Sequence, residues 1–159
     1  MKTHPPPRVG FFVWQVILSP TRIPVMLLRL IFAAILGAIL GLERELRKKT
    51  GGVKTNALVS LASCGFILIV REINSAETAR VITGIIQGVG FIGGGLILKA
   101  GNTAKNVTGA AEIWVSSAIG IACGVGLWQM AISLLLISLL LLRLTRKYLP
   151  PHSPNSHPQ

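Results

Sequence analysis

Charged residues are scarce in this sequence of 159 residues, making up 13% of it, whereas soluble domains usually carry about 25%. Acidic residues are the scarcest, since five of them stand against 16 lysines and arginines. The charges are segregated between long apolar runs, and 51% of all residues are hydrophobic. This composition excludes an ordinary soluble domain and is typical of an integral membrane protein.

Catalytic and metal-binding side chains are also missing from the apolar runs. All three histidines, His4, His152 and His157, lie in the proline-rich ends of the chain. Cys64 and Cys123 each lie inside an apolar run, where a small soft side chain is ordinary packing, although the sequence does not exclude a disulfide. No serine in the apolar runs is matched by a histidine. We therefore expect no enzyme activity, no metal site and no cofactor.

The net charge of +11 raises the question of nucleic acid. The basic residues cluster where apolar runs end, as they do beside anionic lipid headgroups. No basic face carries interleaved aromatic residues on which bases could stack. The bilayer is therefore the expected partner of this charge, and nucleic acid is not.

The apolar runs predict an all-α bundle of about five transmembrane helices, several of them short for the roughly 20 residues that a crossing needs. The runs cover residues 25–42, 55–70, 80–98, 109–126 and 129–143. The last two could also be read as one hairpin broken near 126–128. Residues 1–24 are expected to form a tail with a short interfacial segment at 11–18, and whether that segment inserts is left open. Residues 25–143 form the transmembrane domain and 144–159 a basic, proline-rich cytoplasmic tail.

Five crossings place the two ends of the chain on opposite sides of the membrane. With the N-terminus outside, the cytoplasmic segments hold about twice as many lysines and arginines as the outer ones. Cytoplasmic loops normally carry this excess. We therefore predict an N-out, C-in orientation.

The run at residues 83–98 has no charge and six glycines. In a soluble helix each glycine would cost about 1 kcal/mol relative to alanine, but in a bilayer glycines let neighbouring helices approach closely. We therefore expect this run to be the central span. It contains Gly88-Val-Gly90-Phe-Ile-Gly93, which matches the dinucleotide pattern G-x-G-x-x-G. That motif should follow a strand and open a helix, so helix packing is the favoured interpretation.

Small or polar residues recur at four-residue spacing in the first four runs, which marks one face of each helix. Such stripes indicate close packing between membrane helices. The stripes are Arg29, Ala33, Gly37 and Gly41; Asn56, Ser60 and Cys64; Arg80, Gly84 and Gly88; and Thr108, Glu112, Ser116, Gly120 and Gly124. The fifth run is rich in leucine and has no stripe. We expect it at the rim, facing lipid.

Glu112 lies about one turn inside the fourth run, on its small-residue stripe. A carboxylate at that depth is costly unless it is paired or faces water, so it is a functional candidate by default. Its expected partners are Lys54, Arg44 or Lys99, and a purely structural ion pair is an equal alternative. Arg29 and Arg80 lie near the outer ends of their runs, where they could snorkel to headgroups or hold a ligand.

Four motifs in order resemble the MgtC/SapB family of bacterial membrane proteins. They are GAILGLERE at 37–45, GGVKTNALVSLAS at 51–63, QGVGFIGGGLILKAG at 87–101 after Arg80, and NVTGAAEIWVSSAIGIACG at 106–124. The resemblance covers roughly residues 25–143. It implies an inner-membrane bundle of about five helices, N-out, linked to magnesium homeostasis and adaptation to low magnesium. It also implies that members modulate other membrane machinery, including proton-coupled ATP synthase, rather than carry magnesium.

The resemblance also carries the family's motif positions onto this sequence. These positions are Glu43, Arg44 and Glu45; Thr55 and Asn56; Arg80; Gly88, Gly90, Phe91 and Gly93; and Trp114. The chain departs from the family pattern at Gly109 and Glu112, where the family often has a threonine and a small polar residue. It ends soon after the fifth run, so the cytosolic regulatory domain of longer members is not expected.

Two functions follow as hypotheses. The first is a non-catalytic regulator that binds another membrane protein through its glycine-rich helices, with further copies of this chain as a second kind of partner. The alternative is a transporter or channel for a divalent cation, namely magnesium. Magnesium prefers several oxygen ligands in near-octahedral order, and only Glu112 lies inside a run, so the regulator is favoured.

Overall fold

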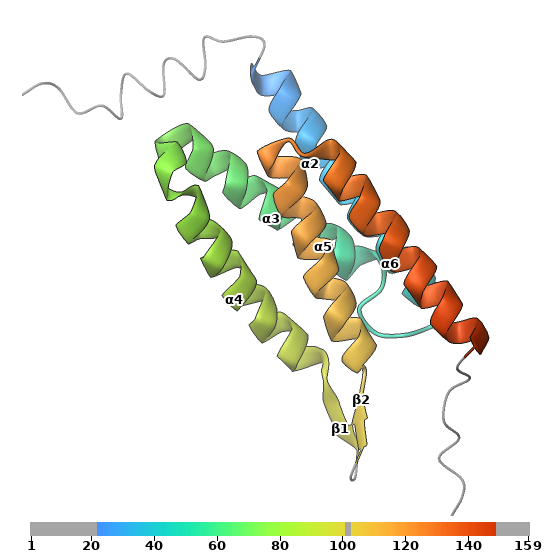
Figure 1. The fold of residues 1–159 in the computed structure, drawn as a ribbon. Helices are drawn as coiled ribbons and strands as arrows, with labels where there is room; N and C mark the ends of the chain where they lie inside the picture. The colour runs from blue at the N-terminus through green and yellow to red at the C-terminus, as the bar shows by residue number, and fades with distance from the viewer. Residues whose placement is uncertain (1–21, 101–102, 149–159) are drawn as a thin grey trace, which may run out of the picture.

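A computed structural model describes residues 22–100 and 103–148. The described part holds five helices, and a one-turn 3-10 helix at Ser75–Glu77 joins the second to the third (Figure 1). The helices are α2 (Arg22–Glu45), α3 (Val53–Asn74), α4 (Thr78–Leu96), α5 (Val107–Val125) and α6 (Trp128–Tyr148). Each predicted run falls on one of these helices, so the predicted all-α bundle of about five helices is confirmed. The expected interfacial segment at 11–18 and the three histidines lie outside the described residues.

The helices have the length and composition of membrane spans. Three helical stretches of the described chain are long and apolar enough to cross a bilayer, namely Arg22–Glu45, Val53–Leu96 and Val107–Val125. The second stretch contains both α3 and α4, which the 3-10 turn folds back on each other. A further, shorter apolar helix covers Trp128–Leu144. The chain is therefore a membrane protein.

A small hairpin joins α4 to α5. Strands β1 (Leu98–Ala100) and β2 (Thr103–Lys105) pair antiparallel, with Leu98 opposite Lys105. Two residues separate the strands in the sequence, which is the commonest spacing for a hairpin. The sequence analysis did not predict these strands, because each is too short to show an alternating pattern.

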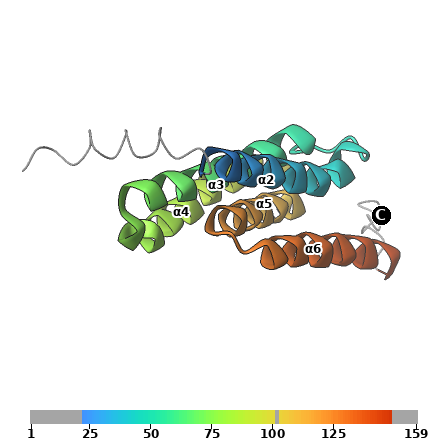
Figure 2. The ribbon, with the colours of Figure 1, turned by 90° about the horizontal axis from the view of Figure 1, so that it is seen from above.

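Helix α5 occupies the centre of the bundle. It packs against α2, α3, α4 and α6, and both ribbon views place α4 and α6 on opposite sides of it (Figures 1 and 2). A Cβ on Gly120 of α5 would collide with the main-chain oxygen of Ser60 in α3, and one on Gly37 of α2 would lie 2.6 Å from the main-chain oxygen of Asn56. The small-residue stripes of α2, α3 and α5 therefore face one another, as predicted, and glycine is what allows their close approach.

The predicted place of α4 is wrong. Around Gly84, Gly88, Gly94 and Gly95 an added Cβ would meet no heavy atom within 4 Å. The buried residues of α4 are Ile85, Val89 and Gly93. Branched side chains one helical turn apart make the contact with the bundle, and most glycines are left on the outer face. The run at 83–98 is thus a peripheral helix, and α5 is the central one.

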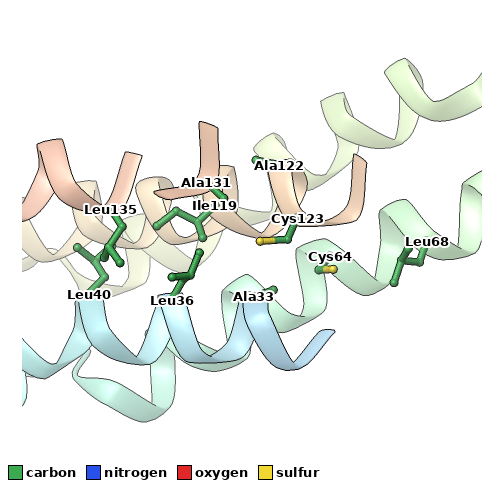
Figure 3. Packing of buried hydrophobic residues seen from close by; sticks show 10 residues of the cluster. All are labelled: Ala33, Leu36, Leu40, Cys64, Leu68, Ile119, Ala122, Cys123, Ala131 and Leu135. Carbon is green, nitrogen blue, oxygen red and sulfur yellow. The ribbon is translucent and has the colours of Figure 1, made fainter. Parts of the chain in front are cut away.

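Helix α6 lies at the edge of the bundle, as expected from its leucine-rich sequence. Its residues Leu136 and Leu140 are 60% and 55% exposed, whereas Ala131 and Leu135 are buried in a cluster with α2, α3 and α5 (Figure 3). Cys64 and Cys123 are part of the same cluster, and both are free, buried thiols. Of the two interpretations that the sequence left open for them, the structure shows ordinary packing.

Candidate functional site

Arg44 and Glu112 form a buried ion pair between α2 and α5. The Nη1 atom of Arg44 lies 3.2 Å from Oε1 of Glu112, and the two side chains are 2% and 5% exposed. Arg44 lies in the last turn of α2 and Glu112 in the second turn of α5, so antiparallel packing of the two helices brings them to the same end of the bundle. Of the three cations expected as partners of Glu112, Arg44 makes the ion pair.

The remaining donors of Arg44 hold two loops in place. Nε and Nη2 donate to the main-chain oxygen of Thr50 at 2.9 and 2.8 Å, and Nη2 also donates to Oδ1 of Asn106 at 2.8 Å. Nδ2 of Asn106 in turn donates to Oγ1 of Thr50. The planar guanidinium with its five N–H groups suits this arrangement. One side chain thus connects the end of α2, the α2–α3 loop and the start of α5.

The backbone around this ion pair leaves little space for larger residues. Asn106 has φ of 71°, in the left-handed region where asparagine is enriched. A Cβ on Gly109 would collide with the Arg44 guanidinium. Glycine at position 109 thus leaves room for the Arg44 guanidinium, and Glu112 supplies the carboxylate that pairs with it.

One atom of the cluster is left without a hydrogen bond. Oε2 of Glu112 is buried and has no partner among the described residues. Leaving a buried polar atom unsatisfied costs about 1–3 kcal/mol, and more for a charged group. Arg44 therefore donates a hydrogen bond to one oxygen of this carboxylate, and no described residue donates one to the other.

A second polar layer lies beside the ion pair, between α3 and α5. Oγ of Ser116 donates to Oδ1 of Asn56 at 2.8 Å, and Nδ2 of Asn56 donates to the main-chain oxygens of Gly51 and Gly52 at 2.7 and 3.0 Å. Asn56 is fully buried. Thr55, its predicted companion, is only partly buried. The asparagine therefore fixes the first turn of α3 to α5.

The two acidic neighbours of Arg44 have different contacts. Oε2 of Glu45 accepts a hydrogen bond from the main-chain nitrogen of Val53 at 3.2 Å, at the start of α3. Glu43 pairs with Arg47, which lies in the turn directly after α2. Only the central residue of the Glu43–Glu45 turn reaches the buried cluster.

The other residues singled out by the sequence lie elsewhere. A Cβ on Gly93 would lie 3.6 Å from that of Ala110, and one on Gly90 would lie 3.9 Å from the ring of Trp114. Three of the predicted residues, Gly90, Gly93 and Trp114, therefore line the contact of α4 with α5. Phe91 points outward and is 86% exposed. Arg80 lies at the opposite end of α4, where its side chain is 84% exposed and pairs with Glu77 at 3.2 Å. The predicted residues therefore form several separate groups and no single site.

An open apolar groove runs between α3 and α4. It has a volume of about 890 Å³, and almost all of its lining surface is apolar. Leu58, Ala62 and Phe66 of α3 form one wall, while Gly84 and Gly88 belong to the other. Two of the exposed glycines of α4, Gly84 and Gly88, thus lie on a concave surface.

The hydrogen bonds of Arg44 to Thr50 and Asn106 were not predicted from the sequence. Both residues lie in connections, where no helical period shows which side chains point inward. The one available signal was Asn106 directly before an apolar helix, a position that usually indicates an N-cap. Here its side chain makes no cap hydrogen bond and binds Arg44 instead.

Comparison with known proteins points to one family. The model of the MgtC family matches residues 30–149. An uncharacterized protein of Synechocystis is 40% identical over 107 residues, 67% of this chain and 46% of that protein. Protein MgtC of Salmonella typhimurium is 36% identical over 113 residues, 71% of this chain and 49% of that protein, and Protein MgtC of Brucella abortus is 35% identical over 96 residues, 60% of this chain and 40% of that protein. The chain spans about half the length of these relatives, and no solved structure matches it.

Proposed function

The chain belongs to the MgtC family, and from this we propose that it regulates another membrane protein by binding one of its transmembrane helices. The proposal places it in the bacterial inner membrane as a multi-pass protein, N-out and C-in, with a role in magnesium homeostasis and adaptation to low magnesium. It assigns the chain no catalytic step. The observation that supports it most is the exposed glycine face of α4 beside the α3–α4 groove.

Membrane helices associate through close packing, and small residues permit the closest approach. Gly84 and Gly88 are one turn apart and have no heavy atom near them, so a partner helix could approach the backbone of α4 directly. Leu58, Phe66 and Phe91 are 63%, 54% and 86% exposed along the same groove. These side chains would cover the flanks of the incoming helix, so we propose a single transmembrane helix as the occupant.

The arrangement around Glu112 argues against the alternative, a magnesium transporter or channel. The Arg44 guanidinium lies 3.2 Å from the carboxylate and would repel a divalent cation. No group of three or more His, Cys, Asp or Glu residues in the described part of the chain could hold a metal ion. A magnesium site that used the Glu112 carboxylate would have to break this buried ion pair.

Site-specific crosslinking in native membranes tests the regulator proposal. A photo-reactive residue at Gly88 should capture one other membrane protein, whereas the same residue at Leu136 on the exposed face of α6 should not. A bulky change one turn away, Gly84→Leu, should abolish the Gly88 product without reducing the amount of the chain in the membrane. Capture from Leu136 equal to that from Gly88 would contradict the proposed surface.

Flux measurements separate the two functions. Liposomes containing the purified chain should take up magnesium no faster than empty liposomes. In low-magnesium medium, cells with Gly84→Leu should lose any growth advantage that the chain confers. Magnesium uptake that depends on the chain and survives Gly84→Leu would favour transport over regulation.

A further inference from the structure

A pocket with three arginines lies at the end of the bundle opposite the Arg44–Glu112 pair. It has a volume of about 250 Å³ and lies between the start of α2 and the end of α3. Its lining consists of Arg22, Val25, Met26, Arg29, Leu68, Arg71 and Glu72. No predicted function uses this pocket, and it is separate from the α3–α4 groove.

The positive charge in this pocket exceeds the negative charge. Nη1 of Arg22 lies 3.3 Å from Oε2 of Glu72, which balances one guanidinium. Of the five glutamates in the sequence, Glu72 alone lines the pocket. Among the described residues, neither Arg29 nor Arg71 forms an ion pair with a carboxylate, so the pocket keeps a net positive charge.

Arg29 and Arg71 both reach the C-terminal end of α5. Nη1 of Arg29 donates to the main-chain oxygen of Gly124 at 2.8 Å, and Nη1 of Arg71 donates to that of Val125 at 2.6 Å. The Arg29 guanidinium also lies 5.9 Å from the ring centre of Trp128. Arg29 therefore contacts both the end of α5 and the start of α6. These carbonyls lie at the C-terminal end of α5, where the helix dipole is negative, and they offset part of the positive charge. They do not supply the full negative charge that a second carboxylate or a phosphate would.

Donors remain available around the pocket. Nε of Arg29 is buried and has no hydrogen-bond partner among the described residues. Arg22 and Arg71 each use one nitrogen in the contacts above, and both residues are exposed at the pocket rim. Because a guanidinium has five N–H groups, the three side chains still present several donors. They form a cluster of donors with a net positive charge.

We propose that this pocket binds a phosphate group, either that of an anionic phospholipid or a free phosphate ion. Arginine is the residue best matched to phosphate, because its planar fork can make two parallel hydrogen bonds to the oxygens. Arg22 and Arg29 are seven residues apart, which is about 10 Å along one face of a helix. Val25, Met26 and Leu68 lie beside them and would contact the glycerol and upper acyl chain of a lipid.

Removing the carboxylate of Glu72 can distinguish a phosphate site from arginines that only hold the C-terminal end of α5. If the arginines only held the end of α5 and balanced Glu72, removing that carboxylate would leave Arg22 without a partner and create no affinity. In a phosphate site Glu72 competes with the ligand for Arg22. The Glu72→Gln change should therefore increase phosphate binding.

The lipid arm of the test uses the full chain in nanodiscs of equal phosphatidylglycerol and phosphatidylcholine. Native mass spectrometry then counts the lipids that remain bound after the disc is removed. Phosphatidylglycerol should be retained in preference to phosphatidylcholine. The double change Arg22→Gln with Arg71→Gln should reduce this retention about 30-fold, since each of the two basic groups contributes about 1 kcal/mol to anion attraction near a membrane surface and every 1.4 kcal/mol is tenfold in affinity. Arg29 is left unchanged so that its hydrogen bond to the main-chain oxygen of Gly124 in α5 is preserved.

A matched double variant removes the same charge elsewhere. Arg47→Gln with Arg80→Gln changes two arginines that pair with Glu43 and Glu77 outside the pocket. It should retain phosphatidylglycerol like the unchanged chain. A loss equal to that of the pocket variant would show a general charge effect and overturn the site.

The second arm uses inorganic phosphate, titrated into the chain in an uncharged detergent without anionic lipid and followed by calorimetry. Saturable phosphate binding that is lost in the pocket variant would identify free phosphate as the source. Retention of phosphatidylglycerol without such binding would identify a lipid. Equal retention of both lipids together with no phosphate binding would refute the proposal. Failure of the Gly88 crosslink would leave this result unaffected, because the groove and the pocket are separate surfaces.

Discussion

The guanidinium of Arg44 and the carboxylate of Glu112, 68 positions apart in the sequence, meet at 3.2 Å in a place almost closed to solvent. The same guanidinium binds the α2–α3 loop and the residue that precedes α5. The pair therefore does more than balance charge. It joins three segments at one end of the bundle, and its removal should affect all of them.

Loss of one partner of this pair should destabilise the fold strongly. Glu112→Leu leaves the Arg44 charge buried without a carboxylate, and such changes cost about 3–5 kcal/mol. The free energy of unfolding in detergent micelles measures the effect. Arg80→Gln is the control, because that exposed pair is worth about 0–1 kcal/mol. A Glu112→Leu variant as stable as this control would contradict a structural role for the pair.

Substitution by alanine should lower the stability of the fold at Gly120 and leave it unchanged at Gly88. In Gly120→Ala the new methyl group collides with the main-chain oxygen of Ser60, and such overpacking typically costs about 1–3 kcal/mol. Gly88→Ala places its methyl group in open space and should not lower stability. Thermal unfolding of the two variants side by side makes the comparison. Equal losses in both would mean that α4 is packed as tightly as α5.

Arg29 should stabilise the end of α5 more than its neighbour Arg22 does. Arg29→Gln removes the 2.8 Å hydrogen bond to Gly124 and the contact with Trp128. A hydrogen bond from a charged donor contributes about 1.5–3 kcal/mol. Arg22→Gln removes only a pair that is 62% exposed on the arginine side and should cost far less. Measured free energies of unfolding decide which variant is less stable. A larger loss for Arg22→Gln than for Arg29→Gln would contradict the contact of Arg29 with α5.

The two native cysteines should be unreactive in the folded chain. Both are fully buried between α2, α3 and α5. A maleimide reagent should label neither thiol in mild detergent and both after denaturation in dodecyl sulfate. Ser75→Cys, in the exposed 3-10 turn, serves as the positive control. Rapid labelling of the unchanged chain would show that the cluster opens.

The same reagent can test the proposed orientation. Lys48 lies in the α2–α3 loop and Ser75 in the α3–α4 turn, with one helix between them. In intact cells an impermeant maleimide should label Ser75→Cys and should reach Lys48→Cys only after the membrane is opened. Labelling of both from the same side would refute the N-out arrangement.

The helices and much of their packing could be predicted from the sequence. Apolar length located all five helices, and four-residue spacing identified the faces of α2, α3 and α5 that meet. It also placed Glu112 on an inward face beside three candidate cations. These features follow from local periodicity, which the sequence displays directly.

The position of α4 could not be predicted in the same way. Glycine favours close packing but does not say which neighbour fills the space, and Ile85 with Val89 offered an equally regular face. Thr50 and Asn106 were missed because connections have no period. The choice of Arg44 over Lys54 depended on the register of α2 against α5, a relation between segments 68 residues apart.

The distance in sequence between Arg44 and Glu112 also matters while the chain is being made. Ribosomes add about 5–20 residues per second, so Glu112 is synthesised several seconds after Arg44. During that interval a guanidinium sits at the end of α2 without the carboxylate that later neutralises it. A chain that ends before α5 would lack Glu112, so its Arg44 would have no carboxylate from α5 to pair with. An unfinished chain would therefore differ from a complete one by an unpaired cation at the end of α2.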